Sequence, residues 1–131
     1  MKQNQSPSGM ALQDMAAKWR KDAESYRRLF SGDWSEMSKC AVGPDVMMAI
    51  QGQHPALAEA YEECAELMGS RETVAEASHM AALLLSMAHD EVIAARAARS
   101  ADMQWGQHLS RITAYKLCAH ELSQWIKRGG Q

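Results

Sequence analysis

The segment from Ser70 to Arg99 constrains the fold more than any other, because it runs for about thirty residues without a proline or a glycine. Ser70 is suited to cap the start of a helix. From Met80 to Ala88, apolar residues cover nearly the whole circumference of that helix, which is typical of a buried helix. The uncharged run is too short to span a bilayer. We therefore predict an all-α, single-domain bundle of about four to five helices around a buried central helix at about 70–99.

Composition agrees with a single helical domain. The chain has 131 residues, of which 47% are hydrophobic and 23% charged, as in ordinary soluble proteins. Helix-forming residues dominate, and no stretch of five residues alternates like a half-buried strand. We expect residues 1–8 to be a flexible tail and residues 9–131 to form the helical domain.

The start of the chain has no apolar run of the kind found in a signal peptide, so we expect a cytoplasmic protein. The three cysteines are widely spaced and form no CxxC pair, which predicts neither a disulfide framework nor a zinc site. We expect no cofactor and no bound metal.

The helices outside the central segment can also be placed from the sequence. A first helix is predicted from about Gly9 to Phe30, with a short helix after Asp33 and another from Pro44 to Ile50. The run Gly52-Gln-His-Pro55 predicts an interruption before a helix that ends at Gly69. After a break near 100–102, a last helix is predicted over 101–127, ending at Gly129-Gly130.

Charge is distributed unevenly along the chain. Residues 45–91 hold nine acidic residues and one basic residue, a net charge of −8, whereas the remainder carries +6. Such a chain can dock on a charged partner of either sign. Two helix faces are the candidates, an acidic one (Glu59, Glu62, Glu63, Glu66) and a basic one (Arg20, Lys21, Arg27, Arg28). The overall pI near 6.2 disfavours nucleic acid as the main partner.

Two further features suggest other chemistry. Glu76-x-x-His79 has the spacing of a ligand pair in ferritin-like di-metal bundles, and Glu63-x-x-Glu66 could add oxygen ligands. A metal-dependent all-α hydrolase that uses these four residues is therefore an alternative. Glu-x-x-Glu also resembles half of the magnesium motif of the all-α nucleotide pyrophosphohydrolases, whose second half is missing here. Trp34, in a short polar helix, is a candidate interface anchor.

Two segments resemble a known group of proteins. The run from Leu12 to Glu24, LQDMAAKWRKDAE, and the late run from Ala114 to Leu122, with Leu-Cys-Ala-x-Glu-Leu, are similar to small helical accessory proteins encoded by phages and prophages. The resemblance implies a phage accessory protein of the kind that binds and disables a host complex, including CRISPR effectors. It transfers no catalytic residue.

We predict a non-catalytic protein-binding module, which docks on a host protein or protein complex through a charged helix face. On the resemblance, it is a phage-encoded inhibitor of a bacterial defence effector of the CRISPR type, an anti-CRISPR protein. A nucleic-acid-binding protein that uses the basic first helix is a further alternative, and we expect no membrane association.

Overall fold

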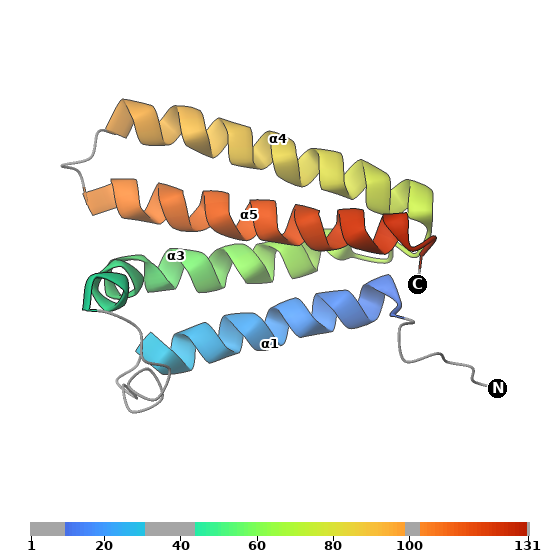
Figure 1. Ribbon diagram of the computed structural model, residues 1–131, viewed down its shortest axis with the longest axis horizontal. Helices are drawn as coiled ribbons and strands as arrows, with labels where there is room; N and C mark the ends of the chain where they lie inside the picture. Colours follow the sequence, from blue (N-terminus) through green and yellow to red (C-terminus); the bar gives the residue numbers. More distant parts are fainter. Residues whose placement is uncertain (1–9, 31–43, 99–102, 131) are drawn as a thin grey trace.

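The computed structural model describes residues 10–30, 44–98 and 103–130, which form four helices and no strand (Figure 1). The all-α bundle is confirmed, with a helix count inside the predicted range. The helices are α1 (Leu12–Phe30), α3 (Pro44–Met68), α4 (Val74–Ala98) and α5 (Met103–Lys127). The short helix predicted after Asp33, together with Trp34, lies outside the described residues.

The helices lie side by side in the spatial order α1, α3, α5, α4, so that α3 and α5 occupy the middle (Figure 1). Helix α4 packs almost entirely against α5 and very little against α3. Leu85 and Ile93 of α4 are 51% and 54% exposed. The prediction that the 70–99 segment is the buried centre of the bundle is therefore wrong.

The reason for this error lies in which apolar residues of α4 face inward. Its buried side is built mainly from small side chains, with Met80 and Leu84 as the large exceptions. Alanines allow α4 to approach α5 closely, and this leaves larger apolar residues on the outer side. The buried alanines of α4 are Ala77, Ala81, Ala88 and Ala95.

Helix α1 follows its predicted apolar stripe closely. Leu12, Met15, Ala16, Trp19 and Ala23 are all buried, at the spacing of one helix face. The helix begins three residues later than predicted, at Leu12. There the Asp14 carboxylate accepts a hydrogen bond from the backbone N–H of Ala11, at 3.4 Å, which satisfies one unpaired donor at the helix start.

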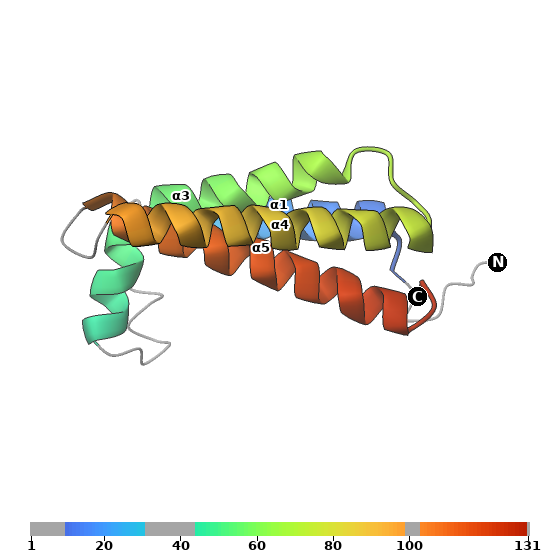
Figure 2. The same cartoon turned by 90° about the horizontal axis from the view of Figure 1, so that it is seen from above.

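Helix α3 is continuous from Pro44 to Met68, so the predicted interruption at Gly52–Pro55 is wrong as a break. The helix is nevertheless bent, because its first turns run at a steep angle to the rest (Figure 2). A bend is expected near Pro55, since proline has no backbone N–H and crowds the carbonyl four residues earlier. Gly69 ends the helix as predicted, with a positive φ of 52°.

The start of α4 is capped by Thr73 and not, as predicted, by Ser70. Thr73 Oγ1 accepts a hydrogen bond from the backbone N–H of Glu76 at 3.1 Å, and Glu76 Oε1 accepts one from the backbone N–H of Thr73 at 3.1 Å. This reciprocal pair is a capping box, and it places the helix start at Val74.

The beginning of α1, the end of α5 and the α3–α4 turn meet at one end of the bundle. The indole N–H of Trp125 donates to the carbonyl of Met10. Gln13 Nε2 donates to the carbonyls of Gly69 at 2.8 Å and Arg71 at 3.0 Å. Gly130 has a φ of 86°, and its backbone N–H donates to the carbonyl of Trp125 at 3.0 Å, which closes the last turn of α5.

A single apolar core joins all four helices. Trp19 lies fully buried within it, and its indole N–H donates to Glu121 Oε1 of α5 at 3.0 Å. Lys18 donates to the same carboxylate at 3.1 Å. Glu121 therefore connects α5 to α1 through two donor side chains, one of which is a buried indole.

Candidate functional site

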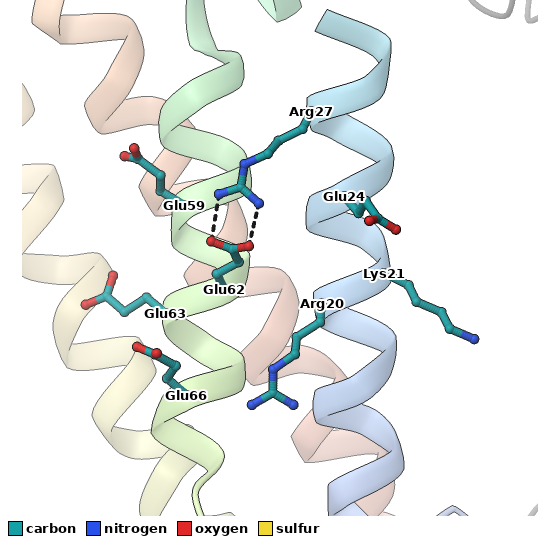
Figure 3. A pocket seen from close by; sticks show the side chains of 8 residues that line it. All are labelled: Arg20, Lys21, Glu24, Arg27, Glu59, Glu62, Glu63 and Glu66. Atoms are coloured by element: carbon teal, nitrogen blue, oxygen red, sulfur yellow. Dashed lines mark hydrogen bonds and ion pairs between the residues drawn. The ribbon is translucent and has the colours of Figure 1, made fainter. Parts of the chain in front are cut away.

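Seven of the eight charged residues predicted to bind a partner line one groove, between α1 and α3, and Glu24 joins them (Figure 3). The groove is open and has a volume of about 660 Å³. The sequence placed an acidic face on one helix and a basic face on another. The structure makes these faces neighbours. The lining residues are Arg20, Lys21, Glu24, Arg27, Glu59, Glu62, Glu63 and Glu66.

Arg27 and Glu62 form a two-pronged ion pair across the groove (Figure 3). Arg27 Nη2 lies 2.6 Å from Glu62 Oε1, and Nη1 bonds the other oxygen. The hydrogen bonds between the two side chains, together with their opposite charges, lower the pKa of Glu62 and raise that of Arg27. Both side chains are largely exposed, so the pair adds roughly 0–1 kcal/mol to the free energy of unfolding.

Three glutamates of α3 form what we call the acidic stripe, which consists of Glu59, Glu63 and Glu66. In Figure 3 they point away from α1, whereas Glu62 points toward Arg27. All three are exposed, and none is in an ion pair within the described part of the chain. Glu63 Oε1 accepts a hydrogen bond from the Tyr115 hydroxyl at 2.6 Å. The stripe therefore has a formal net charge of −3.

The basic face of α1 is used partly inside the molecule. Arg27 is bound to Glu62, and Arg28 lies 3.8 Å from Glu24 of the same helix. Arg20 and Lys21 make no ion pair with any residue that the structure describes, and Lys21 points away from α3 (Figure 3). The basic face consequently offers less uncompensated charge than the acidic stripe does.

A second, smaller pocket lies between α4 and α5, and we call it the Tyr115 pocket. Its volume is about 260 Å³, and its lining residues are Met87, Asp90, Glu91, Ala94, His108 and Tyr115. Sequence reasoning noted Asp90 and Glu91 as part of the acidic segment and as an incomplete second half of the magnesium motif, and it missed His108 and Tyr115. His108 and Tyr115 are seven residues apart on α5, and no local pattern indicates the residues of α4 that they meet.

Glu91 organises the polar wall of this pocket. Its Oε2 lies 2.7 Å from His108 Nδ1, and its Oε1 lies 3.8 Å from Arg111 Nη1. A carboxylate only accepts hydrogen bonds, so His108 must carry a proton on Nδ1. Asp90 is exposed and has no hydrogen bond or ion pair with the described residues.

Tyr115 connects the pocket to the acidic stripe. Its side chain lines the pocket, and its hydroxyl donates to Glu63 of the stripe. Burial raises the pKa of Tyr115, and the hydrogen bond and charge of Glu63 and the charge of Glu91 add to this effect. Carboxylates from α3 and from α4 therefore both lie within electrostatic reach of one tyrosine.

The four residues of the alternative metal site are not assembled. Glu76 belongs to the capping box with Thr73, where its carboxylate also accepts from the backbone N–H of Glu72 at 2.9 Å. His79 is exposed on α4, whereas Glu63 and Glu66 lie on α3. Among residues 10–30, 44–98 and 103–130, no group of three or more histidine, cysteine or acidic side chains could hold a metal ion.

In those same ranges, no helix is both long and apolar enough to cross a membrane. The two segments that carry the phage resemblance touch each other, since Trp19 of the first donates to Glu121 of the second. No family model, no curated protein and no solved structure matches the chain.

Proposed function

We propose that this protein is a non-catalytic binding module whose acidic stripe docks on a basic surface of a protein partner. The observation that carries the proposal is the alignment of Glu59, Glu63 and Glu66 on one exposed side of α3 without an ion-pair partner in the described residues. A basic partner surface would meet three carboxylates at spacings of four and three residues.

The acidic stripe is unfavourable for the isolated helix. Like charges three or four residues apart destabilise a helix by roughly 0.2–0.5 kcal/mol per pair. Helix α3 also has no basic residue in its last turn, where the helix dipole disfavours Glu66. A basic partner would relieve both kinds of repulsion, and this supports a role for the stripe in binding.

On the resemblance of its two segments, we propose a phage-encoded inhibitor of a host complex, such as a CRISPR-type effector, that acts in the cytoplasm. A groove built to hold nucleic acid is basic and would suit the acidic stripe. Nucleic acid binding by α1 is the weaker alternative, because Arg27 and Arg28 are already in ion pairs. The hydrolase alternative lacks an assembled set of ligands among the described residues.

The test compares two charge reversals in capture of a host complex from nuclease-treated bacterial lysate. We expect Glu59→Lys with Glu66→Lys to weaken capture by about tenfold or more, because reversal at two contacts worth about 1 kcal/mol each exceeds the roughly 1.4 kcal/mol of one decade. Arg20→Glu with Lys21→Glu should leave capture nearly unchanged.

Circular dichroism of both double variants checks that the bundle is intact. If the first variant captures the same complex as the wild type does, the acidic stripe is not the docking surface. If only the second variant fails, the working surface is the basic face of α1.

A further inference from the structure

The Tyr115 pocket adjoins the acidic stripe, and its size and chemistry bear on what the partner presents. The pocket has room for about nine water molecules, at roughly 30 Å³ for each. That is below the range of about 300–1,000 Å³ for small-molecule sites, and it suits a single side chain. The pocket is too small for an element of secondary structure.

The lining of the pocket matches a long cationic side chain. Met87 and Ala94 supply apolar wall for a methylene stem, and Asp90 supplies a carboxylate with no partner among the described residues. Long basic side chains bury their stems against apolar surface and keep the charged head at polar groups. The planar fork of a guanidinium fits a carboxylate with two hydrogen bonds, which an ammonium cannot match.

The charge around the pocket also favours a cation. Asp90 and Glu91 line the pocket, Glu63 lies at its Tyr115 boundary, and each has a formal charge of −1, whereas Arg111 beside Glu91 has a formal charge of +1. The net charge of these four residues is therefore −2.

We propose that the Tyr115 pocket receives one arginine side chain of the protein partner, next to the basic surface that the acidic stripe binds. This inference rests on the proposed function and names the anchor residue of that partner. Tyr115 gives the two sites a common boundary, since it lines the pocket and donates to Glu63. Desolvated arginines are among the residues that contribute most to binding at protein interfaces.

The test uses fluorescence anisotropy with the full chain and three labelled hexapeptides, which contain three arginines, three citrullines or three lysines. Citrulline has nearly the same shape as arginine and no charge. We expect the arginine peptide to bind about tenfold or more tightly than the citrulline peptide, and several-fold more tightly than the lysine peptide. Equal binding of the arginine and lysine peptides would overturn the assignment of an arginine.

Two variants of the pocket locate the bound side chain. Asp90→Asn removes the free carboxylate, and Ala94→Leu fills the pocket without a change in charge. Asp90→Asn should weaken binding of the arginine peptide about fivefold, as the loss of one exposed charge contact does, and Ala94→Leu should weaken it by a similar or larger factor. The matched controls are Glu72→Gln, with the same loss of charge before α4, and Ala97→Leu on the exposed side of α4. Both controls should bind nearly as the wild type does.

The outcomes separate this inference from the proposed function. If both pocket variants bind the arginine peptide as the wild type does, the pocket inference is overturned. The acidic stripe is tested separately by capture of the host complex with Glu59→Gln and Glu66→Gln together, and loss of capture in this variant leaves the proposed function standing. If the pocket variants fail and the stripe variant captures its host complex normally, the pocket stands and the proposed docking through the stripe fails.

Discussion

The carboxylate of Glu121 accepts hydrogen bonds from two side chains of α1. The Trp19 indole, which donates one of these hydrogen bonds, is fully buried, whereas the Lys18 side chain is about half exposed. A buried donor without an acceptor loses more free energy than an exposed ion pair contributes. The indole bond therefore accounts for most of the effect of Glu121 on stability.

At the residue scale, we predict that Glu121→Ala lowers the free energy of unfolding by about 1–3 kcal/mol, because it leaves the Trp19 N–H without an acceptor. Glu121→Gln keeps a carbonyl oxygen and loses only the charge toward Lys18, so it should cost roughly 0–1 kcal/mol. Urea unfolding followed by circular dichroism measures both, with the exposed neighbour changed in His120→Ala as the control. Equal losses for the two Glu121 variants would contradict this account.

At the scale of the helix, α4 begins with a side-chain cap. Its first turn is fixed by the reciprocal hydrogen bonds between Thr73 and Glu76. Hydrogen bonds from the backbone N–H groups of Glu72 and Thr73 to the Glu76 carboxylate lower the pKa of Glu76. Glu76 is therefore explained as a capping residue, and the Thr-x-x-Glu spacing in the sequence was the signal that identifies this role.

We predict that Thr73→Ala lowers the free energy of unfolding by about 0.5–2 kcal/mol, the usual loss for an N-cap. Glu76→Gln should cost less, since glutamine can take the same place in a capping box. Thermal unfolding measures both, and Ser78→Ala on the exposed side of α4 is the control. A Thr73→Ala variant as stable as Ser78→Ala would show that the cap does not limit the stability of α4.

The buried side of a helix could be predicted from the sequence where the helix has one apolar stripe, as α1 does. The sequence could not give the position of α4, because that segment is apolar on all sides and its periodicity does not indicate which side faces the core. It also could not show that α3 continues through Pro55, because packing against neighbouring helices can hold a bent helix together where local propensity favours a break.

The candidate site was predictable only as a set of charged residues. Which charges pair depends on the packing of α1 against α3, and local sequence does not specify it. Arg27 and Glu62 are 35 positions apart, and nothing near either of them indicates the other. The Tyr115 pocket could not be predicted for the same reason. Its residues come from two helices and include His108 and Glu91, which are 17 positions apart.

For the whole molecule, one core contains three groups whose pKa is raised. Burial is the largest cause for Tyr61 and Tyr115, and the hydrogen bond with Cys64 is the largest cause for Cys118, followed by burial. A raised pKa means that the folded state keeps a proton that the unfolded state releases at high pH. The stability from these groups is therefore complete below the unfolded pKa values, about 8.5 for cysteine and 10 for tyrosine, and falls above them.

We predict that the free energy of unfolding decreases from about pH 8.5 upward and more steeply above about pH 10. Urea unfolding at several values between pH 7 and pH 10.5 measures the profile. Tyr115→Phe removes one titrating group, so its decrease above pH 10 should be shallower than that of the wild type. A stability that is constant or rising over this range would contradict the prediction.

The contacts at the end of the bundle where the start of α1 meets the end of α5 also mean that the order of the helices along the chain can be changed. The Trp125 indole bonds the Met10 carbonyl, so a short linker could join the end of α5 to the start of α1. A new opening in the turn at Gly69–Arg71 would then give the order α4, α5, α1, α3 with every helix neighbour preserved. In this bundle, adjacency in space does not depend on which helix is made first, so a circularly permuted chain can form the same groove and pocket.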